Sequence, residues 1–210
     1  MSVKDAINWR KAVKSYINKP ISEEDLNAII EAGRLAPSAY GVEPVKVVAI
    51  KSDDAKKAIL PAVLEGNHKK INTAPVTLVL LAANGEYASD TEFLTERFSR
   101  WLPSEMVNGY VQAVQGVING AVDANSFSDH QTYIAAGFIT LQAADLQIGS
   151  NVMTGFDPQA LEKILAKYDV LDKNRYHPTL LISLGYYDAN EPMVAFRRTR
   201  ISHDDFAQEI

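Results

Sequence analysis

Short apolar runs rich in β-branched residues alternate along the chain with longer segments whose apolar positions recur at helical spacing. Four of these runs predict strands, at residues 45–50, 75–83, 149–153 and 178–185. All but the short run at 149–153 are almost continuously apolar, which is typical of a sheet covered on both faces. We therefore expect helices on both sides of the sheet.

The helix expected before the first strand has clear boundaries. Ser22 and Asp25 resemble a capping box that begins an amphipathic helix, and Pro37 ends it. A second, longer helical stretch separates the second and third predicted strands; it includes residues 90–102, 105–122 and 129–147. The pattern thus predicts alternating helices and strands.

Residues 133–144, with the sequence YIAAGFITLQAA, are apolar on nearly every side of the predicted helix. A helix of this kind is buried all round. Two arrangements would bury it in a chain of 210 residues: a subunit interface, or a central position under the sheet of a monomer. The hydrophobic pattern favours neither.

Composition narrows the function. The 210 residues, of which 47% are hydrophobic and 22% charged, predict a single domain over residues 1–210. A net charge of −5 argues against a nucleic-acid partner, and the sequence has no cysteine for disulfides, iron–sulfur clusters or dithiol chemistry. Redox chemistry would therefore need a bound cofactor. Without a signal peptide or an apolar run of about 20 residues, we expect a cytoplasmic protein with no membrane partner.

Two basic clusters are the remaining candidates for chemistry. The four histidines lack metal-ligand spacing, so we expect no metal site, and no nucleophile elbow, phosphate-binding loop or dinucleotide fingerprint is present. One cluster, RKAVK, contains Arg10, Lys11 and Lys14; the other, FRRTR, places Arg198 and Arg200 on one side of an extended segment. Both suit a phosphate group, although runs of charge are more often simply a solvated surface.

The order of several motifs resembles the FMN-dependent nitroreductase family. The opening of that family is similar to residues 10–50, RKAVKSYINKPISEEDLNAIIEAGRLAPSAYGVEPVKVVAI. The resemblance continues in NHKK (67–70), in QTYIAAGFITLQAADLQIGSNVMTGFD (131–157) and in the closing SLGY and RRTR. It implies an α+β nitroreductase-like fold: a central mixed β-sheet flanked by helices, in an intertwined homodimer with a C-terminal extension that wraps onto the partner.

The resemblance also implies where FMN binds. Its phosphate and adjoining polar edge would meet Arg10, Lys14, Arg198 and Arg200. Its ribityl chain and ring would approach Pro37, Ser38 and Ala39, and its pyrimidine edge would meet Asn67 and Lys70. The backbone N–H of Gly155, next to a helix start marked by Asp157 and Pro158, would donate to flavin N5. Lys11, Ala12 and Thr154 complete the predicted cofactor-binding set. No side chain is expected to act as a catalytic acid, base or nucleophile, since the flavin carries the chemistry.

Some positions depart from the family pattern. Ala12 stands where serine is common, Gly41 where asparagine is common, and Val45 where tryptophan often follows the proline. Thr154 replaces glutamate or glycine. Glu43 replaces glutamine, and its carboxylate would disfavour anionic acceptors near the flavin unless it is paired.

The resulting expectation is an enzyme. Hydride from NADH or NADPH would pass through flavin N5 to a nitroaromatic, a quinone or a similar acceptor in a ping-pong cycle. Two alternatives stay open: a flavin-binding regulatory or storage protein without turnover, and a specialised flavin or enoate reductase on the same scaffold.

Overall fold

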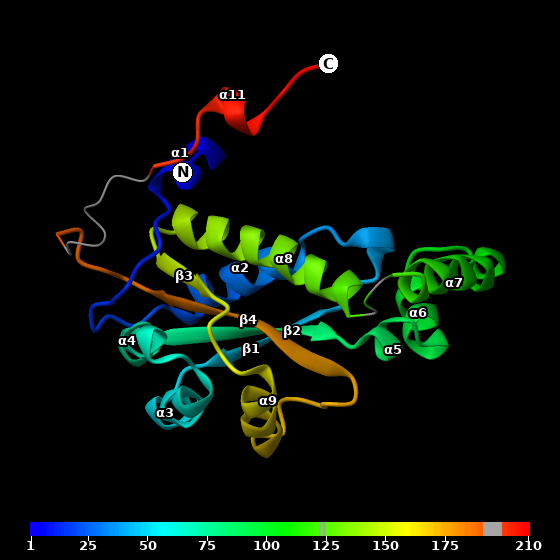
Figure 1. Ribbon diagram of the computed structural model, residues 1–210, viewed down its shortest axis with the longest axis horizontal. Helices are drawn as coiled ribbons and strands as arrows, with labels where there is room; N and C mark the ends of the chain where they lie inside the picture. The colour runs from blue at the N-terminus through cyan, green and yellow to red at the C-terminus, as the bar shows by residue number, and fades with distance from the viewer. Residues whose placement is uncertain (122, 124, 191–198) are drawn as a thin grey trace.

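A four-stranded sheet forms the centre of the computed structural model, which describes residues 1–121, 123, 125–190 and 199–210 (Figure 1). The strands are β1 (Val45–Ile50), β2 (Val76–Ala83), β3 (Gly149–Met153) and β4 (Tyr176–Gly185). Their order in the sheet is β1-β2-β4-β3. Each predicted strand is confirmed, with differences of one or two residues where β2 and β4 begin.

The α+β fold is also confirmed, but the direction of the strands differs in part from the mixed sheet that we expected. All three pairs of neighbouring strands are antiparallel. Among the described residues, parallel pairing is confined to one isolated bridge between Ala12 and Ser150. Continuous apolar runs indicate that both faces of a sheet are covered, and antiparallel strands meet that condition when helices lie on both sides.

Helices cover the two faces of the sheet (Figure 1). One face carries α2 (Glu23–Arg34) and α8 (Ser126–Asp145), and α1 (Val3–Trp9) packs on α8. The other face carries α3 (Asp53–Ile59), α4 (His68–Thr73) and α9 (Pro158–Lys167). Strand β2 shows the division: Leu78 and Leu80 pack toward α2 and α8, whereas Val79 and Leu81 pack toward the opposite core.

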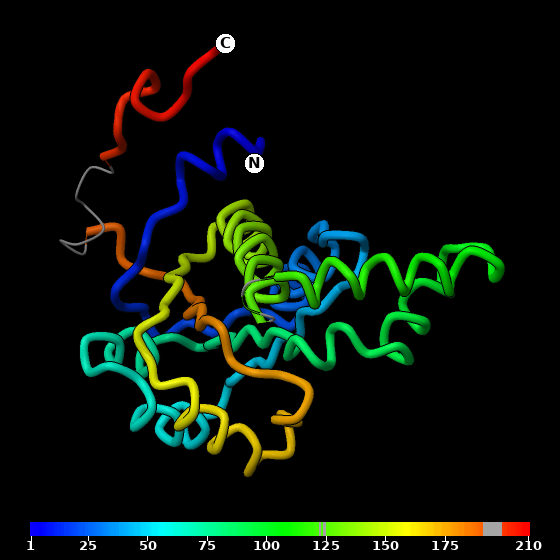
Figure 2. Tube along the Cα trace, turned by 45° about the vertical axis from the view of Figure 1, so that its right-hand side comes forward, coloured from blue at the N-terminus to red at the C-terminus, as the bar shows by residue number. Residues whose placement is uncertain are grey.

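Three further helices project beyond the end of the sheet where β2 ends (Figure 2). They are α5 (Gly85–Ala88), α6 (Thr91–Phe98) and α7 (Ser104–Asn119). Phe93, Phe98 and Val111 belong to a separate apolar cluster that holds this group of helices together. Short 3₁₀ helices, η1 (Ala39–Gly41), η2 (Leu60–Ala62) and η3 (Glu65–Asn67), complete the connections around the sheet.

The predicted helix boundaries follow from local chemistry. The Ser22 side chain accepts a hydrogen bond from the Asp25 N–H at 3.0 Å, which caps α2. The Asp157 carboxylate accepts from the N–H groups of Gln159 and Ala160, and Pro158 occupies the first turn of α9. Both starts are as the sequence predicted.

Helix α8 contains the apolar stretch and is only partly covered by the chain itself. Ile139, Ala143 and Ala144 are buried against the sheet, whereas Tyr133, Ile134 and Phe138 are 52%, 40% and 43% exposed. Residues 199–210, which include α11 (His203–Phe206), extend away from the sheet beyond α1 (Figures 1 and 2). Over the described part of the chain, no helix is both long and apolar enough to cross a bilayer, and no group of three metal-binding side chains occurs.

Candidate functional site

Residues 10–14 follow α1 and run along the free edge of β3. The Val13 N–H donates to the Ser150 carbonyl at 3.1 Å, and the amide Nδ2 of Asn151 donates to the Val13 carbonyl at 2.8 Å. Because Asn151 is buried, these bonds fix the backbone between Lys11 and Lys14. The edge strand therefore positions two of the predicted basic residues.

Lys14 lies near enough to Lys70, which comes from α4, for the two charges to influence each other. Burial lowers the pKa of Lys70 below its ordinary value, and the charge of Lys14 lowers it further. The Lys70 ammonium donates to the side-chain oxygen of Asn67 and to the Gly66 carbonyl, the latter at 3.2 Å. Two neighbouring cations repel each other, so this pair is a favourable place for an anion or for electron-rich ring oxygens.

The turn after β3 packs against Asn67. Two donors reach the Gly155 carbonyl: Asn67 Nδ2 at 3.2 Å and the Leu64 N–H at 3.0 Å. A Cβ atom at Gly155 would lie 2.8 Å from Asn67 Nδ2, so a larger residue there would displace the Asn67 side chain. The Gly155 N–H has no acceptor within the part of the chain that the structure describes. A backbone donor thus accompanies Asn67 and Lys70, with exposed Thr154 next to it.

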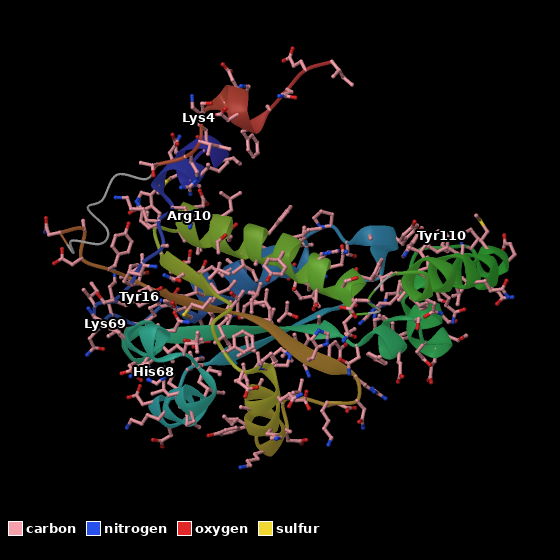
Figure 3. All side chains as sticks on the ribbon, viewed as in Figure 1. Lys4, Arg10, Tyr16, His68, Lys69 and Tyr110 are labelled. Carbon is pink, nitrogen blue, oxygen red and sulfur yellow. The ribbon has the colours of Figure 1, made fainter. Side chains whose placement is uncertain are left out.

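Arg10 and Arg200 meet at a third place in this region. They line a cavity of about 420 Å³ together with Ile7, Gly137, Thr140 and Leu141. Arg10 lies at the C-terminal half of α8, above the strand edge that carries residues 12–14 (Figure 3). Arg198, the fourth predicted phosphate ligand, lies outside the described residues.

We call two sets of predicted residues by fixed names. The β3 group contains Arg10, Lys11, Ala12, Lys14, Asn67, Lys70, Thr154 and Gly155. The α2 loop contains Pro37, Ser38 and Ala39.

The α2 loop lies near the other end of α8. The Ala39 N–H donates to the side-chain oxygen of Gln131 at 3.0 Å, and Ser38 Oγ accepts from the Glu43 N–H at 3.0 Å. Gln131 precedes Thr140 of the Arg10 cavity by nine residues, a rise of about 14 Å along a helix. The sequence predicted one site from these residues. A single chain instead keeps the α2 loop and the β3 group at opposite ends of α8.

Glu43 is paired in the structure. Its carboxylate lies 3.4 Å from Nη1 of Arg100. Its backbone has a φ of +50°. Gly41, another departure from the family pattern, has φ of +69°, which glycine adopts without strain. The condition that we set for Glu43, an unpaired carboxylate near the flavin, is therefore not met in this structure.

Sequence reasoning missed three side chains that shape these regions. Gln131 holds the α2 loop, Asn151 holds residues 12–14, and Arg97 lines a cavity beside the α2 loop. Gln131 and Asn151 are both buried polar residues inside otherwise apolar segments. Buried polar groups are nearly always hydrogen-bonded. A polar residue within an apolar segment is therefore the sequence signal that could have identified Gln131 and Asn151.

Comparison with known proteins gives a consistent result. The model of the nitroreductase family, described as "Nitroreductase family", matches residues 7–186. A protein of Staphylococcus haemolyticus that is provisionally named an NAD(P)H nitroreductase is 32% identical over 193 residues, which cover 87% of each chain.

Two solved structures share the fold. A Bacillus subtilis protein described as a nitroreductase superposes with a TM-score of 0.83 at 21% identity, covering 99% of this chain and 98% of that one. A protein of Exiguobacterium sibiricum, solved in complex with FMN, superposes with a TM-score of 0.81 at 20% identity, covering 100% and 98%.

Proposed function

Because the chain belongs to the nitroreductase family, we propose that it is an FMN-dependent oxidoreductase that takes electrons from NADH or NADPH and passes them to a small acceptor. Nitroaromatics and quinones are the acceptor classes that we propose. The observation that carries this proposal is the β3 group, in which the Gly155 N–H, Asn67 and Lys70 lie together beside Lys14.

The donors and acceptors of the β3 group fit FMN. The pyrimidine edge of a flavin presents both carbonyl oxygens and an N–H, and Asn67 with Lys70 can serve both kinds of atom. The Gly155 N–H, with no acceptor in the described chain, can donate to flavin N5. Arg10, Lys14 and Arg200, with Arg198 from outside the described residues, are the proposed ligands of the terminal phosphate. When bound, FMN supplies hydride transfer in a ping-pong cycle.

The protein residues in this proposal bind and orient. Lys70 places positive charge at the pyrimidine edge, where it favours the more negative, reduced form of the cofactor. Asn67 Nδ2 donates to the Gly155 carbonyl and so holds in place the turn that carries the Gly155 N–H. No side chain of the β3 group needs to act as an acid, base or nucleophile.

A homodimer is the second part of the proposal. The exposed apolar residues Tyr133, Ile134 and Phe138 form a continuous face of α8 that a second copy can cover. The separation of the α2 loop from the β3 group supports a site in which each copy contributes one of the two. The C-terminal segment, with Phe206 80% exposed, supports an extension onto the partner.

The proposal is tested by spectroscopy on the purified protein. We expect FMN to bind stoichiometrically, and anaerobic NADPH or NADH to bleach the visible absorption of the bound flavin. Menadione or a nitrofuran should then restore the colour and support steady-state NAD(P)H oxidation. A protein that binds FMN without bleaching would be a flavin-binding protein without turnover, which would contradict the enzymatic part of the proposal.

A further inference from the structure

A cavity of about 360 Å³ lies between α2, β1, α6 and α8, beside the α2 loop. The apolar part of its lining contains Ile30, Ala36, Val45, Val47 and Ala135. The polar part contains Arg34, Ser38, Glu43, Arg97, Arg100 and Gln131. A small ligand with an apolar body and a charged end suits such a cavity.

Two of the three arginines donate hydrogen bonds to carboxylates. Arg34 donates from Nε and Nη2 to Glu31, at 2.7 and 2.6 Å. Arg100 donates to Glu96 at 2.6 Å and lies 3.4 Å from Glu43. These pairs leave the polar part of the lining close to neutral around Arg34 and Arg100.

Arg97 differs from both. Its guanidinium lies over the Phe93 ring, with 4.8 Å between Cζ and the ring centre, and its nearest carboxylate contact, to Glu96, is 3.7 Å long. Its Nε is buried, and no acceptor for it exists within the described part of the chain. The side chain is only 19% exposed. A mostly desolvated guanidinium that lines a cavity, and that is hydrogen-bonded to no carboxylate among the described residues, is a strong receptor for an oxyanion.

We propose that this cavity receives the oxyanion of a substrate, a carboxylate or a phosphate, with Arg97 as its principal ligand. The apolar part of the lining would hold the carbon skeleton next to that group. Pro37 and Ser38 line the same cavity, so a ligand there would lie beside the cofactor. This inference rests on the proposed function, because the α2 loop is assigned to the flavin by that proposal.

Two substrates could supply the oxyanion: a carboxylated electron acceptor, or NADPH through its 2′-phosphate. Matched pairs separate these sources. The acceptor pair is 4-nitrobenzoate and nitrobenzene, which differ by the carboxylate. The donor pair is NADPH and NADH, which differ by the phosphate.

Binding is measured first, without turnover. Benzoate is titrated calorimetrically into the FMN-loaded protein, into Arg97→Met, and into Arg175→Met as a matched control. Arg175 also lies over an aromatic ring, that of Tyr87, but does not line the cavity. We expect benzoate affinity to fall at least about tenfold in Arg97→Met and to be unchanged in Arg175→Met.

Kinetics then identify the source. If the acceptor carries the oxyanion, Arg97→Met should raise the KM for 4-nitrobenzoate about tenfold or more and leave nitrobenzene unchanged. If NADPH carries it, the KM for NADPH should rise while that for NADH stays constant. Either result supports the proposal. Equal effects within both pairs, together with unaltered benzoate binding, overturn it.

Glu43→Gln gives a test of opposite sign, which remains informative if Arg97→Met fails to fold. Removing this carboxylate leaves Arg100 with Glu96 alone and makes the cavity more positive. Benzoate should bind several-fold more tightly to Glu43→Gln; unchanged or weaker binding contradicts the proposal.

Menadione, which is uncharged, reports separately on the proposed function. If menadione reduction fails while benzoate still depends on Arg97, the oxidoreductase assignment fails and the oxyanion site stands.

Discussion

The two ends of α8 organise their charges in different ways. At the β3 group, Lys14 and Lys70 lie near each other, and the Gly155 N–H has no acceptor in the described chain. At the cavity beside the α2 loop, Arg100 is held by two carboxylates. Like charges are favourable only with an anion between them, whereas paired charges neutralise each other. The first end is therefore suited to hold a charged cofactor, and the second to select what approaches it.

If a dimer brings the α2 loop of one copy to the β3 group of the other, breaking the dimer should have the largest effect on FMN binding. We expect the wild-type protein to sediment at roughly twice 23.1 kDa at micromolar concentration. Phe138→Asp would place an unpaired carboxylate in the proposed interface at a cost of about 3 to 5 kcal/mol. The variant should sediment as a monomer and lose FMN.

Tyr168→Asp is the matched control for this experiment, because Tyr168 is 50% exposed but lies at the end of α9, on the other face of the sheet. It should remain dimeric and bind FMN. A wild-type monomer that retains FMN would contradict the shared site.

The phosphate site is tested next through the two arginines that line the cavity beside α8, Arg10 of the β3 group and Arg200 of the C-terminal segment. The double variant Arg10→Ala with Arg200→Ala should weaken FMN binding by about 2 to 4 kcal/mol, since charge-assisted hydrogen bonds are worth about 1.5 to 3 kcal/mol each and need not add. Fluorescence titration of FMN measures the change. Riboflavin, which lacks the phosphate, should bind wild type and variant equally; a matching loss of riboflavin affinity would mean that the arginines do not read the phosphate.

The local elements were predictable from the sequence because local chemistry determines them. Continuous apolar runs located β1 and β2, and Ser22 and Asp157 located the starts of α2 and α9. Each of these signals operates over a few residues, so neighbouring residues are enough to detect it.

The relation between distant residues was not predictable in the same way. The ion pair between Glu43 and Arg100 joins residues 57 positions apart, and the bond from Ala39 to Gln131 joins residues 92 apart. Such contacts depend on how α6 and α8 pack, which no local pattern encodes. The family resemblance placed the α2 loop and the β3 group in one site, but their positions at opposite ends of α8 became visible only in the folded chain.

A smaller effect is expected from removing the charge of Lys70 in the β3 group. Lys70→Met keeps the apolar stem and removes the charge. If the ammonium favours the reduced cofactor by about 1 to 2 kcal/mol, the two-electron midpoint potential should fall by about 20 to 45 mV. Spectroelectrochemical titration of the FMN-loaded proteins measures it. Lys69→Met, an exposed neighbour on α4 (Figure 3), should leave the potential unchanged. Equal potentials for Lys70→Met and wild type would remove Lys70 from the pyrimidine edge.

The smallest effect is expected at Asp129, which joins the start of α8 to the sheet. Its carboxylate oxygen lies 2.8 Å from Nε2 of His177 and accepts from Thr179 Oγ1 at 3.0 Å. Burial would raise the pKa of Asp129, but these contacts outweigh it and hold the pKa below its ordinary value. A lowered pKa in the folded state means that the charged carboxylate stabilises the fold above about pH 4, and that this contribution disappears as the pH falls through the lowered value.

Asp129→Asn should therefore reduce the free energy of unfolding by about 1 kcal/mol at pH 7. Urea unfolding should show that difference shrinking as the pH falls below about 4, while Asp204→Asn, on the exposed C-terminal segment, shows none at either pH. A difference that stays constant from pH 7 to pH 3 would mean that Asp129 acts through packing rather than through its charge.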